Sequence, residues 1–93
     1  PYPSVERDLS FIVNKKIKYK EISDTISSVS GKLLKNISLF DLYKGKSIEN
    51  DQHSLALSFL FNSDKRTLVD DEIDRIMDKI IKTLKEKYNI AQR

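Results

Sequence analysis

Hydrophobic and polar residues alternate along two stretches of the chain, and a period of two is typical of half-buried β-strands. In residues 5–13 the apolar residues that share one parity are Val5, Leu9, Phe11 and Val13. In residues 53–61 they are Leu55, Leu57, Phe59 and Phe61, opposite the mostly small Ser54, Ala56, Ser58 and Leu60. We therefore expect two strands that bury these eight apolar residues on one face of a sheet. Arg7 interrupts the pattern at a strand start, where it can still reach solvent.

A period near 3.6 residues predicts two amphipathic helices. The apolar face of residues 19–30 and the turn after them is Ile22, Ile26, Val29 and Leu33, and Gly31 stands where a left-handed cap residue is expected. The apolar stripe of residues 68–88 is Val69, Ile73, Ile76, Met77, Ile80, Ile81, Leu84 and Tyr88. Thr67 and Asp70 have the spacing of a capping box, which predicts where the second helix begins.

The remaining segments complete the order of elements. Residues 36–43 predict a strand whose apolar residues fall on both parities, so the pattern leaves its facing open. Residues 44–52 are polar, contain Gly45 and predict a hairpin loop, and residues 89–93 are long enough for one short strand. The order β-α-β-β-α-β predicts an α+β fold of the ferredoxin-like split βαβ type. In that fold two helices cover one face of a four-stranded antiparallel sheet, and the other face meets solvent or a partner.

Length and composition narrow the possible functions. The 93 residues predict a single domain spanning 1–93, and the chain begins Pro1-Tyr2-Pro3, which we interpret as a fragment of a longer chain. Seventeen basic and 14 acidic residues give a formal net charge of +3, which permits an anionic partner such as RNA. The absence of cysteine and the single histidine exclude disulfides and argue against a zinc site. No apolar run approaches the roughly 18 residues of a membrane span.

No catalytic constellation is evident in the sequence. His53 stands at a strand start beside polar residues, and we interpret it as a solvent-facing strand-end residue. Four acidic residues lie close together at the expected start of the second helix, Asp70, Asp71, Glu72 and Asp74. Their favourable interaction with the positive end of the helix dipole explains them better than a cation site does. The chain holds only two glycines, so it has no glycine-rich loop for phosphate. No nucleophile and base can be paired convincingly.

The uncovered sheet face is the best candidate site. If the strand parities are right, this face shows Asp8, Ser10, Ile12, Ser54, Ala56, Ser58 and Leu60. Small residues there leave room for a flat ligand, and Asp41 and Tyr43 join them if Phe40 and Leu42 point toward the helices. A tyrosine ring can stack on a base and a carboxylate can accept hydrogen bonds from a base edge, which is how single-stranded RNA is read. The alternative is a ferredoxin-like regulatory or interaction domain that packs this face on a protein partner.

Four segments in order along the chain resemble a known family. They are Pro3-Ser4-Val5-Glu6-Arg7-Asp8-Leu9-Ser10, Leu39-Phe40-Asp41-Leu42-Tyr43-Lys44-Gly45, Ser54-Leu55-Ala56-Leu57-Ser58 and Thr67-Leu68-Val69-Asp70-Asp71-Glu72-Ile73. Together they resemble the ferredoxin-fold anticodon-binding domain at the carboxyl end of the bacterial phenylalanyl-tRNA synthetase beta subunit. The family usually ends near a Leu-Arg pair, whereas this chain ends Ala91-Gln92-Arg93, so the register of the last strand stays open.

The resemblance implies that the open face meets the anticodon stem-loop of the phenylalanine tRNA. Asp41 and Tyr43 match the family's Asp-x-Tyr and would be the main anticodon contacts. The floor beside them would consist of Asp8, Ser10, Ser54 and Ala56. Charge and position alone suggest three phosphate contacts, Arg7, Lys44 and Lys46.

The resemblance also bears on activity and partners. It transfers no catalytic residue, since the family's aminoacylation site lies on the alpha subunit, so the domain is expected not to be an enzyme on its own. The parent ligase uses ATP, Mg²⁺ and phenylalanine, and this domain is expected to use no cofactor. The expected partners besides tRNA are the rest of the beta subunit and the alpha subunit, in the cytoplasm and without a membrane.

Other functions of this fold fit the sequence less well. Small acylphosphatases need a phosphate-cradling loop after the first strand, and Asn14-Lys15-Lys16-Ile17 contains no glycine. A ferredoxin-like regulatory domain would be expected to pair with a second copy. A conventional RNA-recognition motif would place aromatic residues of its third strand on the open face, whereas Phe59 and Phe61 share the core parity.

Overall fold

The computed structural model describes residues 2–45 and 48–93, and its elements follow the predicted order. The strands are β1 (Val5–Asn14), β2 (Leu34–Tyr43), β3 (Gln52–Phe61) and β4 (Ala91–Gln92). The helices are α1 (Tyr19–Ser30) and α2 (Asp70–Tyr88). β2 begins two residues earlier than the pattern predicted, and the second helix begins two residues later.

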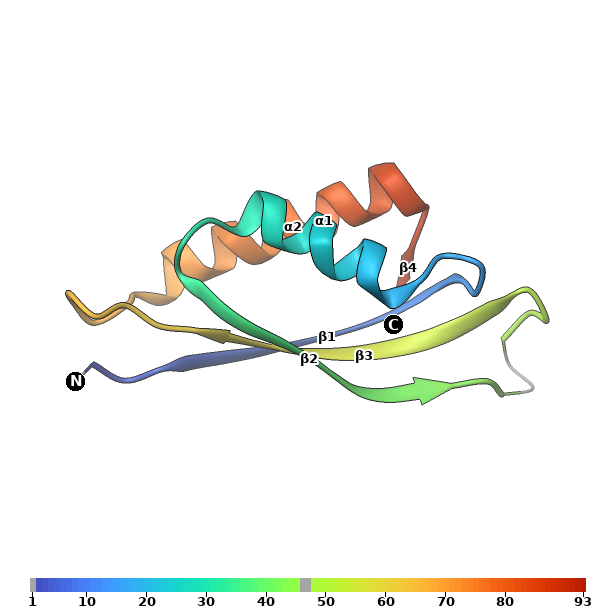
Figure 1. The fold of residues 1–93 in the computed structure, drawn as a ribbon, viewed down its shortest axis with the longest axis horizontal. Helices are drawn as coiled ribbons and strands as arrows, with labels where there is room; N and C mark the ends of the chain where they lie inside the picture. The colour runs from blue at the N-terminus through green and yellow to red at the C-terminus, as the bar shows by residue number, and fades with distance from the viewer. Residues whose placement is uncertain (1, 46–47) are drawn as a thin grey trace.

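The four strands form one antiparallel sheet in the order β2-β3-β1-β4. Both helices lie side by side on one face of this sheet, and no element covers the other face within the described residues (Figure 1). This is the predicted ferredoxin-like α+β arrangement. The β2–β3 hairpin extends along the long axis of the molecule beyond the ends of the helices, so its far end has no helix above it (Figure 1).

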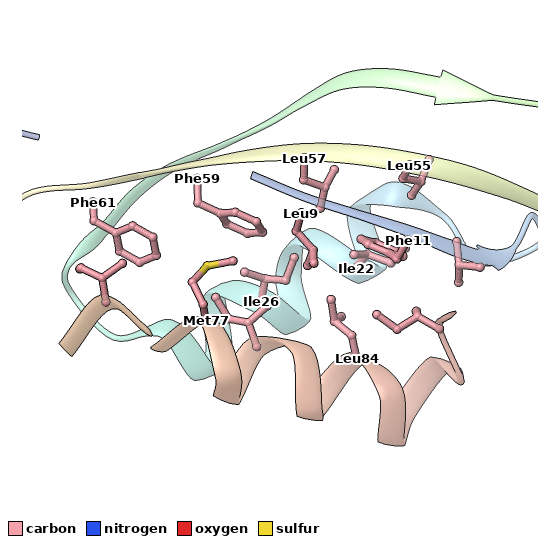
Figure 2. Packing of buried hydrophobic residues seen from close by; sticks show 14 of the residues in the cluster. Leu9, Phe11, Ile22, Ile26, Leu55, Leu57, Phe59, Phe61, Met77 and Leu84 are labelled. Atoms are coloured by element: carbon pink, nitrogen blue, oxygen red, sulfur yellow. The ribbon is translucent and has the colours of Figure 1, made fainter. Parts of the chain in front are cut away.

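The hydrophobic core lies between the sheet and the two helices (Figure 2). The predicted strand residues Leu9, Phe11, Val13, Leu55, Leu57, Phe59 and Phe61 are all buried in it. Pairing of β1 with β3 explains the match, since Leu9 lies opposite Leu57 and Phe11 opposite Leu55. Val5 is the exception, because it is only half-buried at the start of β1. Burial of each such side chain stabilises the fold by about 1.5–3 kcal/mol. Other residues of this same chain bury these side chains.

α1 ends as its sequence predicts. Ile22 and Ile26 are fully buried, and Gly31 has φ +72°, a left-handed value that favours glycine. The helix is fixed to α2 by a hydrogen bond between the Thr25 and Tyr88 hydroxyls at 2.7 Å. Thr25 has a low intrinsic helix propensity, and its place in α1 is supported by this tertiary contact.

The start of α2 corrects the predicted capping box. Thr67 and Asp70 do not form it, because Leu68 is buried in the core and Val69 stays extended, so the helix begins at Asp70. The Val69 N–H donates instead to Glu72 Oε2 at 2.9 Å. Arg66 donates to both oxygens of the same carboxylate at 2.6 and 2.7 Å. These hydrogen bonds lower the pKa of Glu72 to about 2, with the Arg66 contact as the larger cause.

Candidate RNA-binding face

The open face of the sheet brings the predicted residues together in two rows. Ser10 of β1 and Asp41 of β2 both lie opposite Ala56 of the central strand β3. In the next row Tyr43 lies opposite Ser54. These five residues share the face that the helices leave uncovered, because their β3 partners alternate with the buried Leu55 and Leu57.

A β-bulge sets the facing of β2, which the sequence pattern left open. Leu39 lies opposite Leu57, but Asp41 lies opposite Ala56, the next residue of β3, so Phe40 is an additional residue in β2. The extra residue allows both Leu39 and Leu42 to share the helix side while Asp41 and Tyr43 share the open face. Phe40 is 59% exposed, so our condition that it points into the helix layer is not met.

The open face is hollowed where these rows meet. A shallow hollow of about 420 Å³ is lined by Ser10, Asp41, Tyr43, Ser54, Ala56 and Arg93. Its floor consists of small side chains on β1 and β3, and its rim carries a carboxylate, a phenol and a guanidinium. Five of the six lining residues were predicted from the sequence, and Arg93 was not.

Arg93 enters the hollow because β4 pairs with β1. Ala91 lies opposite Ile12 and Gln92 opposite Phe11, and the Arg93 N–H then donates to the Ser10 carbonyl oxygen at 2.8 Å. This register carries the Arg93 side chain over the floor. A two-residue strand has too few residues to show a period, so the only signal in the sequence was a basic residue after the expected last strand.

The Tyr43 ring is held between two neighbours yet remains accessible. The Arg93 guanidinium carbon lies 5.4 Å from the centre of the ring. A Cβ atom at Gly45 would overlap the hydroxyl end of the ring, so the ring lies close against the Gly45 backbone. The Tyr43 side chain is nevertheless 45% exposed, which leaves area for a stacked group.

The other predicted contacts lie outside the hollow. Asp8 is exposed and lies opposite Ser58, one row further from Tyr43. Lys44 follows Tyr43 and is exposed beside a smaller cleft that Lys15 and Gly45 also line. Lys46 lies outside the described residues.

Arg7 is not brought together with the others. Its Nη2 lies 3.3 Å from Asp70 Oδ1 and 3.7 Å from Asp74 Oδ1 of α2. It therefore lies on the helix side of the sheet, away from the hollow, and this placement gives no support to the phosphate contact that we predicted for it. The interruption that Arg7 makes in the apolar pattern is explained by this pairing with the helix.

His53 is another correction, because it is buried rather than solvent-facing, with 9% of its surface exposed. It lies opposite Val13 on the helix side of the sheet. Next to this pair, the Lys15 N–H donates to the Asp51 carbonyl oxygen, a hydrogen bond that joins the turn after β1 to the loop before β3. Neither ring nitrogen has a hydrogen-bond partner among the described residues. Burial, followed by the charges of Lys44 and Lys15, lowers the pKa of His53.

Residues 2–45 and 48–93 lack the features of a metal site and of a membrane-spanning helix. This part of the chain contains no group of three histidine, aspartate or glutamate side chains that could hold a metal ion. None of its helices combines the length and apolar character needed to cross a membrane.

The fold and the hollow define the class of the protein as a ferredoxin-like α+β domain with one open sheet face. The family model described as the ferredoxin-fold anticodon binding domain matches residues 1–93. The chain belongs to this family, as the four sequence motifs had indicated.

Similar proteins share one description. The chain is 43% identical over 92 residues to the phenylalanine–tRNA ligase beta subunit of Bacteroides fragilis. It is 44% identical to that of Syntrophotalea carbinolica and 43% identical to that of Dehalococcoides mccartyi, each over 92 residues. Each match covers 99% of this chain but only 11% of the relative, so the chain spans about a ninth of the length of these relatives.

Proposed function

We propose that the chain is the anticodon-binding module of a phenylalanine–tRNA ligase and that its open sheet face holds the anticodon loop. The observation that carries the proposal is the hollow that combines Asp41 and Tyr43 with a floor of small residues. Membership of the anticodon-binding family and the description of the relatives supply the type of RNA.

The chemistry of the hollow suits an unpaired base. The exposed part of the Tyr43 ring offers a stacking surface, and stacking on an aromatic side chain contributes about 1–3 kcal/mol per base. Asp41 lies two residues earlier, and its carboxylate can accept hydrogen bonds from N1–H and the amino group of a guanine. The phenylalanine anticodon begins with guanine, so the acceptor fits the first anticodon base.

The floor and rim have separate roles in the proposal. Ser10, Ser54 and Ala56 are small enough for a flat base to approach the sheet, and the serine hydroxyls can exchange hydrogen bonds with it. Arg93 lines the hollow, Lys44 directly follows Tyr43, and both would contact phosphates. Asp8, one row outside the hollow, and Lys46 stay predicted contacts. The ion pairs of Arg7 with α2 favour a structural role for that residue.

The module is proposed to position tRNA while the chemistry takes place elsewhere. Aminoacylation would occur on the alpha subunit, with ATP, Mg²⁺ and phenylalanine bound there and no cofactor bound in this domain. The remaining partners would be the rest of the beta subunit and the alpha subunit, in the cytoplasm.

One observation favours a protein contact at the edge strand β2 rather than at the open face of the sheet. Leu39, Phe40 and Leu42 of the edge strand β2 are 37%, 59% and 45% exposed. These residues differ from those that line the hollow, so a protein contact there would not use the proposed RNA-binding surface.

The test uses the complete ligase with Tyr43→Ala or Asp41→Ala. The apparent affinity for the phenylalanine tRNA should fall by about tenfold or more for Tyr43→Ala, the equivalent of one lost base stack. Activation of phenylalanine by ATP, measured by pyrophosphate exchange, should not change. Ser58→Ala, on the same face but outside the hollow, is the matched control. Intact tRNA kinetics in both variants, or equal damage to activation, would show that the assignment is wrong.

A further inference from the structure

A second cleft, of about 290 Å³, lies at the other end of the β2–β3 pair from Tyr43. It is lined by Lys32, Leu33, Lys35, Asn62, Ser63, Asp64, Lys65 and Arg66. These residues come from the connection between α1 and β2 and from the connection between β3 and α2. The Asn62 N–H donates to the Leu33 carbonyl at 3.0 Å, so the two connections are fixed to each other.

The charges of this cleft are only partly neutralised. Both terminal nitrogens of Arg66 are engaged by Glu72 at 2.6 and 2.7 Å. In the part of the chain that the structure describes, Lys32, Lys35 and Lys65 have no carboxylate within ion-pair distance. Asp64 is the one acidic residue in the lining. Three exposed ammonium groups therefore face one carboxylate.

Local backbone features fix the conformation of both connections beside the cleft. Lys35 is an additional residue in β2, since Leu34 lies opposite Phe61 and Asn36 opposite Leu60. On the other side, the buried Ser63 hydroxyl accepts a hydrogen bond from the Lys65 N–H at 3.1 Å. The lysines thus extend from ordered segments.

We propose that this cleft binds phosphate groups of the RNA backbone, independently of base sequence. Ammonium groups bind phosphate as point charges, and the lining contains no aromatic residue on which a base could stack. The identity of the polyanion as RNA rests on the proposed function.

The cleft is separated from the hollow by most of β3. Ser54, in the hollow, and Phe61, beside the cleft, are seven residues apart in β3, so at about 3.4 Å per residue they lie roughly 24 Å from each other. One nucleotide cannot reach both sites. The cleft would therefore contact the helical stem or flanking strand of an RNA whose loop lies in the hollow.

The test removes the three unpaired lysines together as Lys32→Gln/Lys35→Gln/Lys65→Gln. The matched control, Lys79→Gln/Lys82→Gln/Lys85→Gln, removes the same charge from exposed positions of α2. Binding of a hairpin RNA with the phenylalanine anticodon in its loop is measured for the 93-residue chain at several salt concentrations, and circular dichroism melts verify that both variants fold.

Each lost phosphate contact reduces the slope of log affinity against log salt by about 0.7 for a single strand and about 0.9 for a duplex. The cleft variant should therefore show a slope shallower by about 2 and at least tenfold weaker binding near 0.1 M salt, whereas the control should change the slope by less than half as much. Equal effects of the two variants would overturn the proposal. A phosphoserine peptide is the second probe. If the cleft variant loses binding to this peptide but binds RNA as the unchanged protein does, the proposal is overturned in favour of a protein partner.

A hairpin with a scrambled loop separates this proposal from the proposed function. The slope change should be the same on both hairpins, because the cleft reads no bases, whereas Tyr43→Ala should weaken only the anticodon hairpin. If the loops bind equally well but the slope change persists, the proposed function fails and the cleft stands. If the anticodon loop is preferred and the two lysine variants are equivalent, the cleft alone fails.

Discussion

The guanidinium carbon of Arg93 lies 5.4 Å from the centre of the Tyr43 ring, although the two residues belong to opposite edges of the sheet. Tyr43 ends β2, and Arg93 follows β4. Their side chains meet above β1 and β3, where the floor consists of Ser10, Ser54 and Ala56. The contact is possible because these floor residues are small, so the hollow depends on residues from all four strands or their ends.

Arg93 should contribute to RNA binding through its charge and to the position of Tyr43 through its contact with the ring. Arg93→Ala removes both, and an exposed cation–π contact contributes about 0.5–1 kcal/mol to stability. We expect RNA affinity to fall several-fold and its salt slope to become shallower by about 0.7, the value for one phosphate contact. Filter binding at several salt concentrations measures both quantities.

Arg93→Lys is the matched variant, because it keeps the charge but loses the planar guanidinium. It should restore the salt slope but only part of the affinity. If Arg93→Ala leaves the slope unchanged, Arg93 makes no phosphate contact.

A larger side chain on the floor should block the hollow without unfolding the protein. Ala56→Leu places its extra atoms on the open face, between Ser10 and Asp41, and removes nothing from the core. The free energy of unfolding should stay within about 0.5 kcal/mol, as for most surface substitutions. RNA affinity should fall by at least tenfold, measured by fluorescence anisotropy. Ser58→Leu, one row outside the hollow, is the control, and equal losses in the two variants would contradict the assignment of the floor.

The two glycines should respond differently to alanine. At Gly45 the new methyl group overlaps the Tyr43 ring, so Gly45→Ala should move the ring and weaken RNA binding, by less than Tyr43→Ala does.

At Gly31 nothing lies within 4 Å of the methyl group, but φ is +72°. Gly31→Ala should therefore lower the free energy of unfolding by about 1–2 kcal/mol and leave RNA binding unchanged. NMR signals of the Tyr43 ring and urea unfolding measure the two effects, and an unmoved ring in Gly45→Ala would refute the first.

The sequence pattern predicted β1, β3 and their buried residues because a period of two over nine residues specifies which face is buried. It predicted β2 but could not set its facing, since the additional residue Phe40 changes the parity within the strand. It missed Arg93 because β4 has two residues, and its register is set by pairing with β1. His53 was misplaced, and the acidic partners of Arg7 were not predicted, because a polar residue on a buried face is understood only when its neighbours from distant segments are known.

The buried His53 predicts how the stability of the fold depends on pH. Its pKa is lowered in the folded state, chiefly by burial and further by Lys44 and Lys15, so the folded protein takes up the proton less readily than the unfolded chain does. The unfolded chain binds the proton near its ordinary pKa of about 6.5. The stability that the neutral ring provides is complete above that pH and is lost as the pH falls below it toward the lowered folded value.

Urea unfolding at pH 8, 6.5 and 5.5 measures this dependence directly. His53→Phe keeps the size and apolar packing of the ring but cannot be protonated, so its free energy of unfolding should change little over this range, while that of the unchanged protein should decrease. Glu72→Gln is a second control. The folded pKa of Glu72 is about 2, and the stability that this carboxylate provides is lost only as the pH falls below about 4.5 toward that value. The free energy of unfolding of this variant should therefore follow the same pH dependence as that of the unchanged protein between pH 8 and 5.5. Parallel curves for the unchanged protein and His53→Phe between pH 8 and 5.5 would show that His53 is protonated equally well in the folded and unfolded states.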